Sequence, residues 1–258
     1  MLKYQILLII SFLIISCQSD YNLDKFNKDL KPNSTKDMIL IPEGKFIMGS
    51  DNWIEKGSPK REITLKSFYI DKYEVSNYNY NSCVNAKKCQ HSIFYGLKEF
   101  NKLQNPVVGI SFDDALNYCK FLNKRLPTEE EWEKAARGPN GNIYPWGNNP
   151  PKCDKLSYGA AWSSDCKNNP NHTSPINSFK DMVSYYGVYN MSGNVWEWTD
   201  SEYIVKYFYK PKEAKPTYKV IKGGSFGSKK DYIFTYSRRW ERAYQKTIGT
   251  GFRCAKDL

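Results

Sequence analysis

Residues 124–138, KRLPTEEEWEKAARG, decide most of what the sequence predicts about the fold. Thr128 to Glu131 form a capping box, in which each end residue can hydrogen-bond the backbone N–H of the other. Gly138 is a typical helix end. The stretch therefore predicts a helix between Thr128 and Gly138, with one apolar face made by Trp132, Ala135 and Ala136.

Further elements are predicted on the N-terminal side of this helix. The segment 111–114, SFDD, is a second helix start, and that helix continues to about Leu122. A third helix is expected to begin at 75–77 and to end near Ala86. Short runs typical of strands occupy residues 38–41, 45–48, 63–65 and 68–70.

The chain beyond Arg137 is rich in Gly, Pro, Asn and aromatic residues over a long distance. Loops of this length in a compact domain usually need disulfides or ions to hold them. Helices, short strands and long loops together predict an α+β fold. No repeat or linker divides residues 37–258, so we expect them to form one domain.

Composition narrows the class of protein. The 258 residues are 40% apolar, 25% charged and 16% aromatic. These values exclude a coiled coil, a polytopic membrane protein and a largely disordered chain. Two histidines exclude a His-rich metal centre, and the net charge of +11 allows an anionic partner without identifying one.

The N-terminus, MLKYQILLIISFLIISCQSD, predicts the compartment. Lys3 precedes an apolar run over 6–15 that is short for a membrane-spanning helix, and Ser16 and Cys17 follow. This order resembles a bacterial lipoprotein signal. We expect residues 1–16 to be a signal peptide, Cys17 to carry the lipid, and residues 17–36 to be a polar tether. An uncleaved anchor helix is the alternative.

Either interpretation predicts a membrane-attached protein of the bacterial cell envelope, with its body outside the cytoplasm. Gln18 puts no acidic residue next to the lipidated cysteine, which favours the outer membrane.

The segments of the body resemble, in order, those of the formylglycine-generating enzyme or sulfatase-modifying factor domain. The resemblance implies a variant of the C-type-lectin fold with little regular secondary structure. It is carried by MILIPEGKFIMGS at 38–50, DKYEVSN at 71–77, NPVVGIS at 105–111, KRLPTEEEWE at 124–133, PWG at 145–147, GNVWEW at 193–198, GGS at 223–225 and GFRC at 251–254.

Six cysteines remain once Cys17 is assigned to the lipid, and the resemblance implies a disulfide between Cys119 and Cys254. Six cysteines permit fifteen pairings, so the other bridges are expected from proximity alone. Those expected pairs are Cys83 with Cys89 and Cys153 with Cys166.

Catalytic members of this family use two cysteines between Gly-Gly-Ser and Gly-Phe-Arg to hold copper and oxidise a substrate cysteine to formylglycine. This chain has no cysteine between Cys166 and Cys254, and an ungapped alignment places Ser228 and Ile233 at the two positions. Because Cu(I) requires soft thiolate ligands, no copper is expected. The sequence therefore favours a protein that is not an enzyme of this kind.

The resemblance also implies a calcium loop with ligands at Asn190, Gly193, Val195 and Glu197. Calcium binds six to eight hard oxygens, which side chains and turned-in carbonyls can supply. The alternative is that Asn190 and Glu197 hydrogen-bond the loop without a metal.

The last forty residues hold ten Lys or Arg against three acidic residues, which leaves +7 on the segment that forms the family's substrate groove. Interleaved aromatic residues make Arg238, Arg239 and Trp240 the candidates for contact with an envelope protein, an extended peptide or an acidic glycan. A solvated basic face over an aromatic core is the alternative. Nucleic acid is not expected outside the cytoplasm.

The sequence is compatible with three functions. The first is a membrane-anchored, non-catalytic binding or envelope-assembly lipoprotein. The second is a family enzyme that generates formylglycine or uses another chemistry. The third is a purely structural envelope component.

Overall fold

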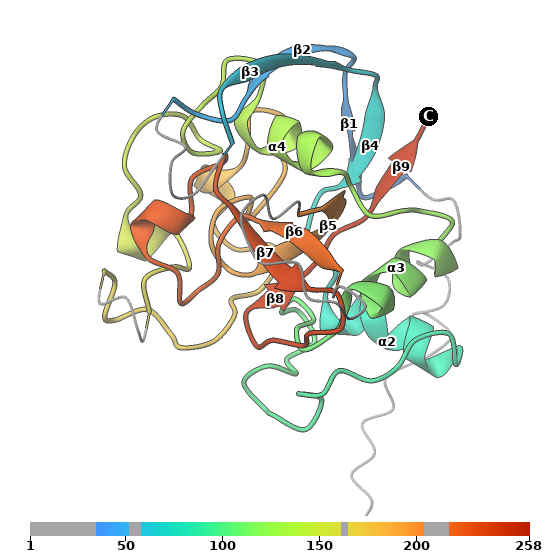
Figure 1. The fold of residues 1–258 in the computed structure, drawn as a ribbon. Coiled ribbons are helices and arrows are strands. Elements are labelled where there is room, and N and C mark those ends of the chain that lie inside the picture. Colours follow the sequence, from blue (N-terminus) through green and yellow to red (C-terminus); the bar gives the residue numbers. More distant parts are fainter. Residues whose placement is uncertain (1–34, 52–57, 161–164, 204–216) are drawn as a thin grey trace, which may run out of the picture.

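The computed structural model describes residues 35–51, 58–160, 165–203 and 217–258 (Figure 1). The predicted signal peptide, Cys17 and nearly all of the predicted tether lie outside the described residues. Among the residues described, no helix is both long enough and apolar enough to cross a membrane.

The three predicted helices are confirmed, and each begins at a side-chain cap. They are α2 (Asn77–Asn85), α3 (Phe112–Phe121) and α4 (Glu129–Arg137). Ser76, Ser111 and Thr128 each accept a hydrogen bond from the backbone N–H three residues later. At the end of α4, Gly138 takes a φ of 70°, a left-handed conformation that residues with a Cβ adopt only with strain.

The four predicted strands are confirmed to within two residues at their ends. They are β1 (Met38–Ile41), β2 (Gly44–Met48), β3 (Arg61–Leu65) and β4 (Phe68–Asp71). Five strands were not predicted: β5 (Trp196–Glu202), β6 (Tyr218–Lys222), β7 (Arg238–Arg242), β8 (Thr250–Gly251) and β9 (Ala255–Asp257). Three short 3₁₀ helices complete the described elements, at Cys153–Lys155, Lys180–Met182 and Lys230–Tyr232.

These strands form three sheets, in the orders β1-β4-β9, β2-β3 and β7-β6-β5-β8. All pairs are antiparallel except β5 with β8, which is parallel. The C-terminal strand β9 pairs with β4 near the start of the body, as Figure 1 shows. The two ends of the described chain are therefore held in one sheet.

All three expected disulfides are present: Cys83–Cys89, Cys119–Cys254 and Cys153–Cys166. The Cys119–Cys254 bridge joins α3 to the residue before β9 across 135 positions. A loop of this length corresponds to about 4 to 5 kcal/mol of stabilisation in the chain-entropy model.

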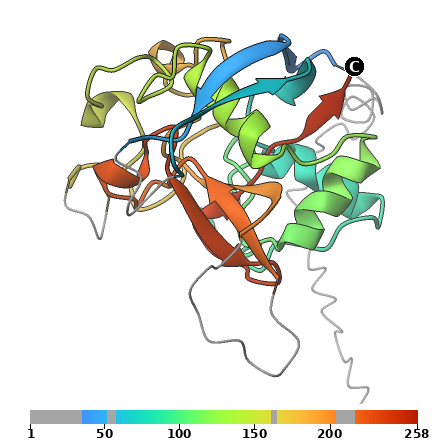
Figure 2. The same ribbon diagram turned by 45° about the horizontal axis from the view of Figure 1, so that its top comes forward.

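The described residues form three buried apolar clusters, two of which include residues of the helices. Figure 2 shows α4, in light green, between the blue N-terminal strands and the orange four-stranded sheet. Trp132, Ala135 and Ala136 of α4 pack against residues of β1 and β4, which confirms the predicted apolar face. In a second cluster, α2 and α3 cover Trp198 of β5 and Ile221 of β6. This packing leaves the polar N-terminal end of α4 directed at β6 and β7.

Candidate functional site

The first part of the candidate site is a buried carboxylate held by an arginine. Glu197 of β5 and Arg253 are both fully buried, and the guanidinium meets the carboxylate with Nη2–Oε1 and Nε–Oε2 distances of 2.6 and 2.7 Å. The indole N–H of Trp132 donates to the same Oε2 at 2.8 Å. Two parallel bonds to a buried carboxylate form a strong, directional pair.

Glu74 adds a second buried carboxylate beside this pair. Its two oxygens accept from the amide groups of Asn190 and Asn194, each at 2.8 Å. Both asparagines have positive φ, 54° and 61°, in the left-handed region that asparagine tolerates better than most residues. The pKa of Glu74 is raised to about 7, mainly by burial; Arg253 opposes this shift, and the Glu197 charge adds to it. We call Glu74, Asn190, Asn194, Glu197 and Arg253 the Glu197 cluster.

The predicted calcium ligands lie in and beside this cluster. Glu197 has both carboxylate oxygens engaged by Arg253 and Trp132. Asn190 directs its amide nitrogen to Glu74, so its oxygen is the atom left for an ion. Gly193 has a φ of 76°, and a Cβ there would overlap the carbonyl of Ser157, so only glycine fits.

The donor set therefore fits calcium only in part. An ion that used the Glu197 carboxylate would share it with two existing donors. Among the described residues, no three His, Cys, Asp or Glu side chains form a group that could hold a metal ion. Calcium at this loop stays a prediction.

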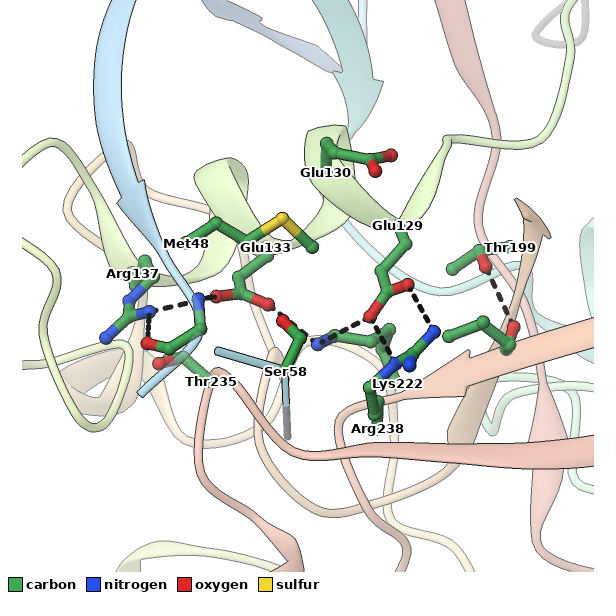
Figure 3. Close-up of polar contacts among 12 residues, drawn as sticks. Met48, Ser58, Glu129, Glu130, Glu133, Arg137, Thr199, Lys222, Thr235 and Arg238 are labelled. Atoms are coloured by element: carbon green, nitrogen blue, oxygen red, sulfur yellow. Dashed lines mark hydrogen bonds and ion pairs between the residues drawn. The ribbon is translucent and has the colours of Figure 1, made fainter. Parts of the chain in front are cut away.

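A second buried cluster lies where α4 meets β6 and β7 (Figure 3). The Lys222 ammonium is fully buried, 2.9 Å from Glu133 and 3.7 Å from Glu129. Arg137 donates to the other oxygen of Glu133 at 2.9 Å, and Arg238 binds Glu129 through two bonds of 2.8 and 2.9 Å. We call these five residues the Glu133 cluster.

Sequence reasoning missed the Glu133 cluster. Of the three acidic residues at the start of α4, only Glu131 belongs to the predicted capping box, where it accepts the backbone N–H of Thr128. Figure 3 shows Glu130 pointing away from the network, while Glu129 and Glu133 point toward Lys222. The spacing of four between Glu133 and Arg137 was the one local signal, because residues four apart share a helix face.

The structure separates the three residues predicted to face a ligand. Arg238 is engaged by Glu129 and lies over the ring of Tyr203 at 4.7 Å, so it is not available as the prediction required. Successive residues of a strand point to opposite sides, so Arg239 faces away from Arg238 and Trp240. Arg239 is exposed, and Trp240 is 43% exposed with its ring edge against Tyr218.

The residues at the family's cysteine positions are part of the local packing. The Ser228 hydroxyl accepts the backbone N–H of Ser225 at 2.9 Å. Ile233 is fully buried among Tyr144, Leu156, Tyr158 and Cys166. In the part of the chain that the structure describes, every cysteine is in a disulfide.

The chain is similar to known proteins of one family. The model of the sulfatase-modifying factor enzyme 1-like domain matches residues 24–258. The inactive C-alpha-formylglycine-generating enzyme 2 of Bos taurus is 31% identical, over 88% of this chain and 90% of the relative. The formylglycine-generating enzyme of Mus musculus is also 31% identical, over 88% of this chain and 77% of the relative.

A solved structure described as PvdO from Pseudomonas aeruginosa superposes with a TM-score of 0.67 at 21% identity, covering 86% of this chain and 94% of that chain. At this identity the likeness shows the fold alone. The predicted α+β, C-type-lectin-like architecture is confirmed.

Proposed function

The chain belongs to the family of sulfatase-modifying factor enzyme 1-like domains, and we propose that it is a non-catalytic binding or envelope-assembly lipoprotein on that scaffold. One observation carries the proposal: the chain has no cysteine between Cys166 and Cys254, so Ser228 and Ile233 stand where the resemblance expects thiols. A hydroxyl is a hard donor and a buried isoleucine has no donor atom, so neither can hold Cu(I).

Overall similarity does not decide between an enzyme and an inactive relative. An enzyme and an inactive member of the family match this chain at the same 31% identity. The residues at the two positions therefore carry the argument. The packing of Ile233 in an aromatic cluster supports it, because an aliphatic side chain at that place contributes to stability.

The activity test is direct. The purified chain is incubated with a sulfatase peptide that carries the substrate cysteine, together with copper and a reductant, and formylglycine is measured by mass spectrometry. We expect no product, with the mouse formylglycine-generating enzyme as the positive control. Formylglycine formed by this chain would overturn the proposal.

Membrane attachment through Cys17 is part of the proposal and has its own test. The chain and its Cys17→Ser variant are expressed in a bacterium and separated by detergent-phase partition. Lipid modification should place the chain in the detergent phase and add an acyl-glyceryl mass to its N-terminal peptide. An unmodified N-terminus in the chain that keeps Cys17 would contradict the anchor.

For the ligand surface, we propose the exposed residues Arg239 and Trp240 in place of the original group of three. Because β7 is the edge strand of its sheet, an extended acidic peptide or acidic glycan that lies along it can contact the Arg239 guanidinium on one face and the Trp240 indole on the other. The expected result is that Arg239→Glu combined with Trp240→Ala weakens binding of a labelled poly-glutamate peptide or a sulfated glycan. Lys66→Glu, which makes the same charge change on an exposed residue after β3, is the matched control. Equal weakening by both variants would point to net charge alone.

Calcium at the loop of Asn190 and Gly193 is the remaining proposal. An ion that binds only the folded chain stabilises it and so raises the unfolding midpoint. At an ion concentration of a hundred times the Kd, the gain in the free energy of unfolding is about 2.7 kcal/mol. Thermal unfolding with calcium and with EGTA measures this effect, and magnesium serves as the control. Identical midpoints in all three buffers would remove calcium from the proposal.

A further inference from the structure

The loop between α2 and α3 exposes an unusual share of the molecule's apolar side chains. Among the described residues, eleven large apolar side chains are exposed, and four of them lie within residues 93–103. They are Ile93 (58%), Tyr95 (48%), Leu97 (48%) and Leu103 (37%). Scattered exposed apolar residues are normal, but a local group of this kind indicates a contact surface.

Ring contacts and a disulfide hold this loop against the rest of the domain, so its exposed side chains project from a fixed backbone. Phe94 packs on Phe100, and Phe100 packs on Phe226 beside the Gly-Gly-Ser turn. The Cys83–Cys89 disulfide fixes the start of the loop to α2. In Figure 1 the loop forms the lower edge of the molecule, next to α2 and far from β2 and β3.

Several backbone N–H groups of the loop are paired within the loop. The N–H groups of Tyr95, Leu97 and Phe100 donate to the carbonyls of Ser92, Phe94 and Leu97 at 3.2, 2.9 and 2.9 Å. Unpaired backbone groups are costly in hydrocarbon. Side chains of this loop can therefore enter an apolar phase without taking unpaired N–H groups of these residues with them.

Four lysines lie in the same stretch of the chain as the exposed apolar side chains. Lys87, Lys88, Lys98 and Lys102 are all exposed, and Glu99 is the one acidic residue between 86 and 104, so four positive charges and one negative leave +3. Within the part of the chain that the structure describes, none of these four lysines forms an ion pair. Lysine is depleted in the cores of protein interfaces, where arginine and tryptophan are enriched, and the loop has neither.

Exposed apolar side chains in a segment that also carries several exposed lysines are typical of surfaces that contact acidic membranes. We propose that residues 87–103 are a membrane-contact surface, which inserts Ile93, Tyr95 and Leu97 into the interface of a bilayer that contains anionic phospholipid. This inference rests on the proposed anchoring through Cys17. It adds an orientation of the body relative to the membrane.

The residues that would link Cys17 to the described body are long enough to allow this orientation, but they do not require it. After cleavage, residues 17–34 would precede the described body, and eighteen residues can span at most about 60 Å. A folded body of about 220 residues has a radius of gyration of about 17 Å. The tether is therefore long enough to let any face of the body contact the membrane. Which face does so depends on the charge and apolar character of the surface.

The experiment places a nitroxide label at two positions of the full chain, reconstituted in phosphatidylcholine vesicles with and without phosphatidylglycerol. Leu97→Cys reports the loop, and Tyr185→Cys, at a side chain that is 62% exposed beside the end of α4, is the matched control. Frequent collision of the nitroxide with oxygen indicates that the label lies in lipid, and frequent collision with a water-soluble nickel complex indicates that it lies in water. We expect a higher oxygen-to-nickel ratio at position 97 than at 185, and a larger difference in anionic vesicles.

A charge variant adds a second readout. Lys98→Glu with Lys102→Glu should lower the ratio at position 97 toward that at 185, whereas Lys66→Glu with Lys152→Glu should leave it unchanged. Equal ratios at 97 and 185 in anionic vesicles would overturn the proposal. Protection of position 97 only after addition of envelope proteins would overturn it in favour of a protein partner.

Vesicle flotation keeps this test separate from the proposed anchor. If the Cys17→Ser chain floats as well as the unchanged chain, the lipid anchor fails while the label still reports the loop of the bound chain. If the unchanged chain floats and its position 97 stays in water, the anchor stands and the membrane-contact surface fails. A chain that does not float in either form contradicts both.

Discussion

The Glu197 and Glu133 clusters are both buried in the same domain, but acidic groups outnumber cations in the first and cations outnumber acidic groups in the second. The Glu133 cluster has two carboxylates and three cations, each carboxylate with two cationic neighbours (Figure 3). The Glu197 cluster has two carboxylates and one arginine, and Glu74 depends on two neutral asparagines. A well-paired cluster mainly fixes the packing of a helix on a sheet, whereas an acid-rich cluster responds to protons or cations.

The largest effect is expected from breaking the single pair of the Glu197 cluster. Glu197→Ala leaves the Arg253 guanidinium buried without its partner, which should cost about 3 to 5 kcal/mol of the free energy of unfolding. Urea denaturation measures the change, with the slope m checked for constancy. The Glu197→Ala, Arg253→Met double variant should recover part of the loss, and a double variant no more stable than the single would argue against an unpaired charge as the cause.

The next effect is a pH dependence of the acid-rich Glu197 cluster. Burial raises the pKa of Glu74 from 4.5 to about 7, so between these values the folded chain binds more protons than the unfolded chain. The stability contributed by Glu74 should therefore be full below about pH 4.5 and fall as the pH rises to about 7. The difference in stability between the unchanged chain and Glu74→Gln, measured from pH 4 to 8, should follow this curve. A flat difference would contradict the shift.

Removal of one cation from the Glu133 cluster should cost less. In Lys222→Met, Glu133 keeps Arg137 and Glu129 keeps Arg238, so we expect a loss of about 2 kcal/mol, in the range for a hydrogen bond to a charged group. Urea denaturation again reports the loss. A loss as large as that of Glu197→Ala would show that the two clusters are equally dependent on one cation.

The smallest effects separate two neighbouring arginines of β7. Arg238→Ala removes a bidentate, half-buried contact with Glu129 and should cost about 1 kcal/mol. Arg239→Ala changes an exposed side chain and should stay within about 0.5 kcal/mol of the unchanged chain. Thermal unfolding of both variants makes the comparison, and equal losses would place both arginines in the same kind of environment.

The helices could be predicted because their signals are local. Ser76, Ser111 and Thr128 each cap a backbone group three residues away, so the cap and its target lie in one short stretch. The strands β5 to β9 could not be predicted in the same way. The short parallel pair of β5 and β8, for example, joins Trp196 to Thr250, and no periodicity within either segment reports that contact.

The sequence by itself determined the helices, the absence of thiols between Cys166 and Cys254 and, through the family resemblance, the Cys119–Cys254 bridge. The tertiary structure decided which charges are buried and which are free. Arg238 and Glu129 are 109 positions apart, and Glu74 and Asn190 are 116 apart. Whether such side chains meet depends on how sheets and helices pack, because burial and pairing are properties of the assembled chain.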